Sequence, residues 1–280
     1  MGRASLGLEL DGVRLEVDAH AGGRVTSLRR GGVELLAGPD VDADNYGSTF
    51  WTSPQSDWGW PPPAEIDRGP YSVEAAGDAI TLTGASYDPL GVRVTKRFSI
   101  DRAKRAFVMN YAIHNASVAP KTCAPWEVTR VPPGGLTFFP TGLPASGTLR
   151  LDERSGASWF EHDAAMASAA GLPAAGLKAF ATGKRGWLAH ATQATHAKRR
   201  LLFIKRFEEV PRDMQAPGEA EIEIYANPRY VELEVQGRYE AIPPASRASW
   251  TVLWCVREVP EGVAVTAGSA DLLACVDATM

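Results

Sequence analysis

Apolar and polar residues alternate with a period of two along most of the chain. Residues 5–17 alternate on both sides of Asp11-Gly12, and residues 22–36 repeat the pattern around Gly31-Gly32. Successive side chains of a β-strand point to opposite faces, so this period is typical of strands with one buried face. A short Gly-containing dipeptide between two such runs is typical of a tight turn. The sequence therefore predicts that the chain opens with two β-hairpins.

Similar patterns continue to the C-terminus. Further strands are expected over residues 71–74, 79–83, 92–100, 106–115, 122–131, 186–191, 200–207, 221–226, 230–236 and 249–256. Residues 136–180 have the weakest pattern, with one possible short helix around Asp163–Ala170, and no capped helical pattern occurs before residue 160. Residues 269–276 fit either a closing strand or a short helix.

Many short strands with almost no helix favour an all-β fold. Strands that follow one another at roughly 8–12-residue spacing are typical of a large antiparallel sandwich or barrel. The sequence shows no internal repeat and no linker long enough to separate two domains. We therefore expect one antiparallel β-sandwich domain over residues 1–280.

One stretch departs from the strand pattern. Residues 45–63 read NYGSTFWTSPQSDWGWPPP and follow neither a strand nor a helix period. Trp51, Trp58 and Trp60 lie there among polar residues that include Gln55. Indole rings stack on weakly polar ligand faces, and amide groups bond hydroxyls, which indicates a sugar-binding wall. The alternative is an aromatic plug over one end of the core, and the two interpretations can apply to different rings.

Two carboxylates share one face of the predicted strand at residues 230–236. Glu232 and Glu234 alternate there with apolar residues, and Gln236 lies on the same face. Their spacing places them about 7 Å apart along the strand. Mutual repulsion and partial burial raise the pKa of one such carboxyl group, which suits general acid–base chemistry near neutral pH. The alternative is an ordinary solvated sheet face.

Other charged residues fall within apolar strands. Trp126 and Arg130 share one strand face and Glu127 lies on the opposite face, so Arg130 or Glu127 is expected in a partly buried cleft. Lys205 shares its face with apolar residues, as a buried lysine or as a charge that blocks edge pairing. Arg24 follows a glycine pair, with an ordinary surface position as the alternative.

Composition limits the remaining possibilities. The chain has 45% hydrophobic and 22% charged residues and a net charge of -4, which is typical of a folded protein and gives no support to nucleic-acid binding. Three separated cysteines and scattered histidines indicate neither a metal site nor disulfides, and no cofactor motif occurs. No signal peptide or membrane span is recognisable, so we expect a cytoplasmic monomer or homodimer.

The chain resembles a known superfamily in three places. Residues 23–36, which contain GRVTSL, a Gly-Gly pair and ELL, resemble the opening hairpin of galactose-mutarotase-like proteins. Residues 230–234, followed by Ile242-Pro243-Pro244 and Trp250, resemble the C-terminal pattern of that superfamily. The aromatic loop is similar to a W-P-S-P-Q-S-D-W-G-W-P-P-P-like loop in one branch, which is defined only as a domain of unknown function. The resemblance covers residues 6–257.

This resemblance implies a β-supersandwich whose concave face binds a carbohydrate. In the enzymes of the superfamily a Glu on a late strand takes the proton of the anomeric hydroxyl, and a His on a middle strand protonates the ring oxygen. Glu234 matches the base, with Glu232 second. The segment that corresponds to the His strand, residues 124–130, contains no histidine. Glu127 or Lys205 is therefore expected as the acid or electrostatic partner, because arginine keeps its proton at this pH.

Three functions remain open. The first is a mutarotase-like epimerase that acts on the anomeric centre of a monosaccharide or its derivative, and the second is a non-catalytic carbohydrate-binding or sensor domain. The third is a purely structural aromatic cluster. We expect the first, with the second as the alternative that the missing histidine favours. The predicted substrate-binding residues are Arg24, Trp51, Gln55, Trp58, Trp60, Trp126, Arg130, Glu232 and Gln236.

Overall fold

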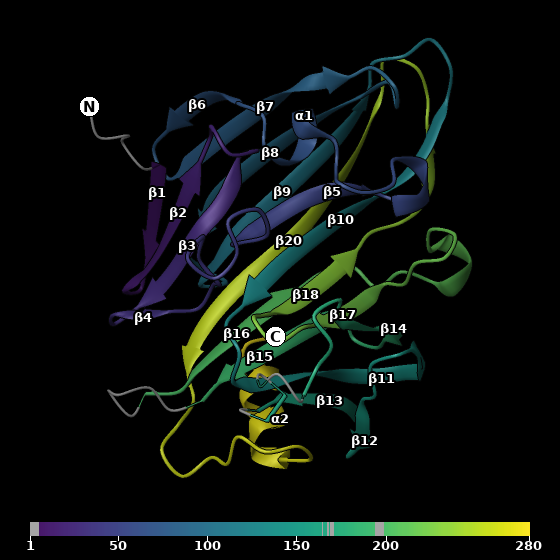
Figure 1. The fold of residues 1–280 in the computed structure, drawn as a ribbon. Helices are drawn as coiled ribbons and strands as arrows, with labels where there is room; N and C mark the ends of the chain where they lie inside the picture. Colours follow the sequence, from purple (N-terminus) through teal and green to yellow (C-terminus); the bar gives the residue numbers. More distant parts are fainter. Residues whose placement is uncertain (1–5, 164, 167, 169–170, 194–198) are drawn as a thin grey trace.

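Two layers of antiparallel strands pack face to face in this protein (Figure 1). The computed structural model describes residues 6–163, 165–166, 168, 171–193 and 199–280. These residues form 20 strands, two short α-helices and two 3₁₀ turns. The predicted all-β antiparallel sandwich is confirmed.

The first layer has the strand order β1-β2-β3-β5-β10-β18-β17-β14. Short β4 lies beside β3, and β19 extends the pairing of β10. The strands are β1 (Leu6–Leu10), β2 (Val13–Asp18), β3 (Arg24–Arg30), β4 (Val33–Glu34), β5 (Ser48–Ser53), β10 (Lys121–Val131), β14 (Leu177–Gly183), β17 (Ile222–Ala226), β18 (Val231–Gln236) and β19 (Glu240–Ile242).

The second layer has the order β6-β7-β8-β9-β20-β16-β15-β11-β13-β12. Long β11 also pairs with β14 through its second half, so it joins the two layers. The strands are β6 (Ser72–Ala76), β7 (Ala79–Tyr87), β8 (Val92–Asp101), β9 (Ala106–Asn115), β11 (Gly135–Gly147), β12 (Asp152–Arg154), β13 (Ala157–His162), β15 (Trp187–Thr192), β16 (Leu201–Arg206) and β20 (Arg247–Glu258).

The opening hairpins form as the alternation predicts. β1 pairs with β2 around Asp11 and Gly12, whose φ angles of 51° and 73° are those of a left-handed turn. β3 pairs with β4 around a second turn, at Gly31-Gly32. Alternating burial along β2 confirms that one face of this hairpin packs on the core.

The structure corrects the prediction in three segments. Residues 48–53 of the aromatic loop form β5, in which every residue is buried, and a strand covered on both faces shows no alternation. A one-turn helix, α1 (Ala64–Asp67), follows the prolines, although no helix was expected there. The weakly patterned region contains β11, β13 and β14, because prolines, glycines and register shifts in β11 interrupt the period.

The C-terminal segment, which fitted either a strand or a short helix, forms a helix. α2 (Ala270–Asp277) begins at Ser269, whose hydroxyl accepts a hydrogen bond of 3.2 Å from the Leu272 N–H. This is a standard N-cap. The short helix expected around Asp163–Ala170 falls in part on residues outside the described ranges. No helix in the described part of the chain is long and apolar enough to cross a membrane.

A buried ion pair crosses the core between the layers. Lys205 of β16 and Glu127 of β10 are both fully buried, and the Lys205 Nζ lies 2.9 Å from Glu127 Oε1. The same ammonium donates to Thr129 Oγ1 at 3.0 Å and to the Leu233 carbonyl at 2.7 Å. All three ammonium donors therefore have partners, which a buried charge requires.

Glu127 is satisfied from the second layer as well. Tyr111 Oη donates to its Oε2 at 2.6 Å, and Trp254 Nε1 donates to its Oε1 at 3.0 Å. Phe50 of β5 stacks on the Tyr111 ring with centroids 4.3 Å apart. The pair thus belongs to the inter-layer core, and its position does not support the acid or electrostatic role predicted for Glu127 and Lys205.

Removing one member of this pair is expected to be costly. Lys205→Met should lower the free energy of unfolding by about 3–5 kcal/mol, because it leaves Glu127 uncompensated in the core. Urea unfolding measures this difference. The double variant Glu127→Gln/Lys205→Met should recover part of the loss, since the amide carries no charge, its oxygen can still accept from Trp254 Nε1, and its NH2 group can donate to the Tyr111 hydroxyl oxygen. A single variant as stable as the wild type would contradict this account.

Candidate active site

A cleft of about 510 Å³ opens on the outer face of the first layer. Its volume falls in the range of small-molecule sites. Strand alternation explains its location: Leu233 of β18 faces the core, so Glu232 and Glu234 face the opposite way. Both glutamates line the cleft, together with Lys178 of β14.

Strand register sets four polar side chains in a row across this face. Lys178 lies opposite Tyr225, Tyr225 opposite Glu232, and Glu232 opposite Arg130. Residues directly opposite each other on neighbouring strands share a face and come into contact. The four strands β14, β17, β18 and β10 therefore bring together residues that are up to about a hundred positions apart in the chain.

Lys178 bridges two carboxylates in the next row. Its Nζ lies 2.5 Å from Glu223 Oε2 and 3.1 Å from Glu234 Oε2. Trp126 Nε1 also donates to Glu234 Oε2, at 2.9 Å, and the Lys178 ammonium lies 4.9 Å from the Trp126 ring centroid. Burial lowers the pKa of Lys178, but the charges of Glu234 and Glu223 outweigh that effect and raise it above its usual value. Lys178 is therefore a permanent cation in the cleft.

Glu234 has one free acceptor. Its side chain is 1% exposed, and its Oε1 is buried without a hydrogen-bond partner among the described residues. A buried carboxylate oxygen without a donor is unfavourable unless a ligand supplies one. Because Glu234 lines the cleft, a ligand hydroxyl can satisfy this oxygen.

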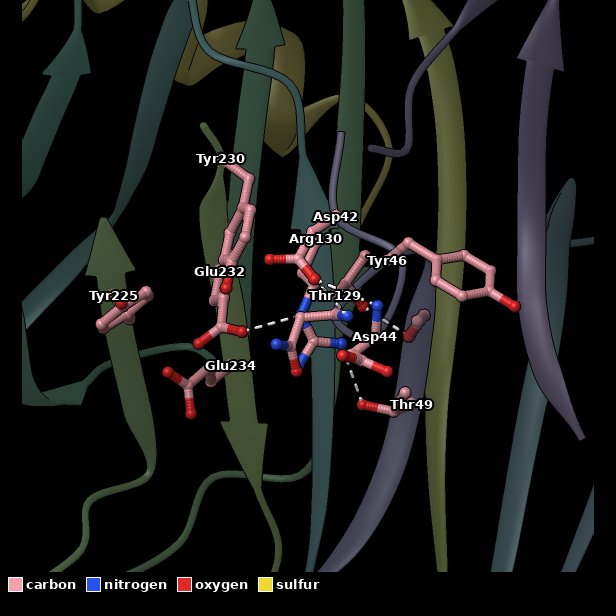
Figure 2. A network of polar contacts seen from close by, with 12 residues as sticks. Asp42, Asp44, Tyr46, Thr49, Thr129, Arg130, Tyr225, Tyr230, Glu232 and Glu234 are labelled. Atoms are coloured by element: carbon pink, nitrogen blue, oxygen red, sulfur yellow. Dashed lines mark hydrogen bonds and ion pairs between the residues drawn. The ribbon is translucent and has the colours of Figure 1, made fainter. Parts of the chain in front are cut away.

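Glu232 is paired with a fully buried arginine (Figure 2). Arg130 Nε donates to Glu232 Oε1 at 2.8 Å, and Arg130 Nη1 donates to Thr49 Oγ1 at 3.2 Å. Burial, followed by repulsion from Glu234, raises the pKa of Glu232 to about 7, although Arg130 and Lys178 act in the opposite direction. A carboxyl group with a pKa in this range suits proton transfer near neutral pH.

The tryptophans near the cleft have two kinds of position: three line it and form its aromatic wall, and Trp58 packs against the core. Trp51, Trp60 and Trp126 line the cleft, and the Trp51 ring stands nearly perpendicular to both of the others. Trp58 instead packs against the core, and its Nε1 donates to the Thr52 carbonyl at 2.8 Å. Trp51 and Trp60 therefore have the positions that the wall interpretation requires, and Trp58 has the position that the plug interpretation requires.

The predicted site residues fall into three groups by position. Those that line the cleft are Trp51, Gln55, Trp60, Trp126, Glu232 and Glu234. Those that lie directly behind its surface are Trp58, Arg130 and Gln236, whose amide donates to Glu223 Oε1 at 2.9 Å. Those that do not reach it are Glu127, Lys205 and Arg24.

Arg24 is buried rather than exposed, and it supports the wall from behind. Its Nη1 donates to the Asp44 carbonyl at 2.8 Å, and its Nη2 lies 3.4 Å from both carboxylate oxygens of Asp67. Asp67 Oδ1 in turn accepts a hydrogen bond of 2.8 Å from Trp51 Nε1. Arg24 therefore acts on the cleft through Asp67 and Trp51, and direct substrate binding by Arg24 is not supported.

Several cleft residues were not found from the sequence. Lys178, Glu223 and Tyr225 lie on β14 and β17, and Tyr230 precedes β18. Lys178 falls in the weakly patterned region, where no strand was expected. Glu223 and Tyr225 alternate with apolar residues within β17, and this alternation was the sequence signal that could have placed them on the outer face of the sheet. Only the pairing of β17 with β18 identifies them as neighbours of the two glutamates.

Several solved structures that match most of this chain are named galactose mutarotase-like proteins or related enzymes. A galactose mutarotase-like protein from Lactobacillus casei matches with a TM-score of 0.59 at 9% identity, over 91% of this chain and 100% of that one. A galactose mutarotase related enzyme from Lactobacillus acidophilus matches with a TM-score of 0.58 at 9% identity, over 95% and 99%. This chain has the galactose mutarotase-like fold. No family model and no curated protein matches the sequence.

A protein from Synechocystis sp. PCC 6803 is similar over the same extent. It matches this chain with a TM-score of 0.60 at 15% identity, over 91% of this chain and 96% of that one. Across the described residues, no group of three or more His, Cys, Asp or Glu side chains is placed to hold a metal ion. The described cleft offers carboxylates, the Lys178 ammonium, the Arg229 guanidinium, amides, phenol groups and aromatic rings.

The raised pKa of Glu232 predicts a specific pH dependence of stability. Between its ordinary value of 4.5 and about 7, the folded protein holds a proton at Glu232 that the unfolded chain has lost. The contribution of Glu232 to the free energy of unfolding therefore falls as pH rises from about 4.5 to 7. Glu232→Gln cannot ionise, so its unfolding free energy should increase relative to wild type from about pH 4.5 to 7.

Urea unfolding of both proteins across this pH range measures the difference. Glu74→Gln, at an exposed position on β6, is the matched control and should show no such trend. A difference between Glu232→Gln and wild type that is constant with pH would show that Glu232 titrates normally.

Proposed function

We propose that this protein is a mutarotase-like epimerase that interconverts the anomers of a sugar in the cleft. The observation that carries the proposal is the pair of Glu232 and Glu234. One has a pKa near 7 and the other presents a buried, unpartnered oxygen, and both lie beside an aromatic wall. Two carboxyl groups in different environments are the usual arrangement for an acid and a base in one site.

Glu234 is the proposed base. Lys178 and the Trp126 N–H both contact its Oε2, which leaves Oε1 to accept the proton of the anomeric hydroxyl. As that proton leaves, the bond between the anomeric carbon and the ring oxygen breaks and a carbonyl group forms. Rotation about the adjacent C–C bond and reclosure on the other face then give the second anomer.

Glu232 is the proposed acid, in place of the histidine of the resembling enzymes. It lies beside Glu234 on the same strand face, and with a pKa of about 7 it is partly protonated at neutral pH. It can protonate the ring oxygen while Glu234 takes the hydroxyl proton, and the two transfers reverse on reclosure. Each positioned acid–base group contributes about 10²–10⁴-fold to a rate. Such a contribution suits a reaction that already proceeds slowly in water.

The aromatic wall supports sugar binding with or without turnover. Trp51 and Trp126 line the cleft beside its polar groups, each almost fully buried in the protein, and aromatic and polar groups together are what carbohydrate faces and hydroxyls require. A non-catalytic carbohydrate-binding or sensor domain needs only these contacts. The absence of a histidine at the cleft-facing positions of β10 is the observation that favours this second candidate.

Anomer exchange in the Glu234→Gln variant separates the two functions. The amide still accepts hydrogen bonds but cannot take a proton, so the exchange rate should fall about 10²–10⁴-fold while sugar affinity is retained. Nuclear magnetic resonance exchange spectroscopy measures the rate for neutral, acidic and phosphorylated monosaccharides. Tryptophan fluorescence measures binding of the same panel.

Glu74→Gln again serves as the matched control and should keep the wild-type rate. Wild-type binding without accelerated exchange would establish the non-catalytic alternative. A Glu234→Gln variant with undiminished exchange would exclude Glu234 as the base.

A further inference from the structure

Among the three tryptophans of the wall, Trp60 is the one whose side chain is mostly exposed to solvent. Its exposed fraction is 59%, whereas Trp51 and Trp126 are 4% and 1% exposed. An exposed indole that also lines a cleft is an unusual use of the largest apolar side chain, and such exposure commonly marks a contact with a ligand or partner. The site proposed so far, at Glu232 and Glu234, does not use it.

The three indoles of the wall form a line from the carboxylates to the rim. Trp126 donates to Glu234 and is therefore at the reacting end. The Trp51 centroid lies 5.3 Å from that of Trp126 and 6.1 Å from that of Trp60. Trp60 is thus one ring further from Glu234 than Trp51 is. A sugar unit that reacts at Glu234 is therefore at the Trp126 end of this series, and Trp60 remains available to a further unit.

The loop that carries Trp60 is fixed before any ligand binds. The backbone N–H of Gln55 donates to Glu219 Oε1 at 3.0 Å, and Trp58 is anchored by its own indole N–H. Gly59 has a φ of 71°, a left-handed conformation that turns Trp58 toward the core and Trp60 toward solvent. A ring held in this way loses little conformational entropy when a ligand covers it.

The cleft that Trp60 lines also offers polar groups for hydroxyls. Gln55 and Asn45 both line the cleft and are only half-buried, so their amides are accessible. An aromatic surface flanked by amide groups matches a sugar unit, which presents apolar C–H faces and hydroxyl edges. The same features make a purely apolar protein contact a poorer fit.

We propose that the cleft takes a glycan of at least two units, with its reducing-end unit at Glu232 and Glu234 and the next unit against Trp60. This inference rests on the proposed function, because anomer exchange requires a free hemiacetal at the carboxylates. Any second unit must then extend away from them, toward the rim. Trp60 is accordingly a specificity-determining residue for chain length.

Binding of a length series tests this inference. The probes are glucose, maltose, maltotriose, cellobiose, cellotriose, galactose and lactose, titrated by isothermal calorimetry against the wild-type protein. At least one disaccharide should bind about 2- to 10-fold more tightly than its reducing-end monosaccharide, the range expected for one aromatic contact. Trp60→Ala should reduce this ratio to about 1, and Trp60→Phe should retain part of it.

Val73→Ala, at an exposed apolar position on β6, is the control and should keep the wild-type ratio. Equal affinity for monosaccharides and disaccharides in the wild type would overturn the chain-length inference and leave the proposed function standing. Failure of every probe to bind or exchange would overturn both. A change of oligomeric state in Trp60→Ala, measured by light scattering, without any change in the ratio would assign the ring to a protein contact and overturn the inference.

Discussion

The alternation of side chains along β10 and β18 is the constraint on which this structure depends. Each strand sends one set of side chains into the core and the other into the cleft, and antiparallel register aligns the two sets. Glu127 and Leu233 are therefore buried between the layers, while Arg130 and Glu232 meet on the outer face. A slip of one residue in this pairing would exchange the two faces, so core packing itself fixes the register of the site.

Charged side chains are paired more completely in the core than in the cleft. In the core, Lys205 and Glu127 satisfy each other's charge, and all three ammonium donors have partners. In the cleft, Lys178 pairs with two carboxylates, and Glu234 Oε1 has no donor among the described residues. An acceptor without a donor destabilises a protein core. In a binding site it can increase ligand affinity, because a ligand can donate the missing hydrogen bond.

The local sequence pattern predicted the fold class and the opening hairpins, but it did not predict every strand or every residue of the site. The hairpin turns, the all-β class and the shared face of Glu232 and Glu234 all follow from a period of two, which needs only neighbouring residues. The burial of Glu127 and Lys205 between the layers could not be predicted, because alternation shows which residues share a face and not which face is the core. Lys178 could not be placed, since its contact with Glu234 arises from pairing between β14, β17 and β18.

The aromatic loop shows how one segment serves both stability and recognition. Trp51 is held on two sides: its N–H donates to Asp67, and the Arg130 guanidinium lies 5.4 Å from its ring centroid. Arg130 also holds Glu232, so the acid and the wall share one fully buried support. A sugar that packs on Trp51 therefore meets a surface whose position is fixed relative to the proposed acid. Such preorganisation is what a proton transfer to the ring oxygen requires, because the transfer depends on a distance that flexible side chains do not maintain.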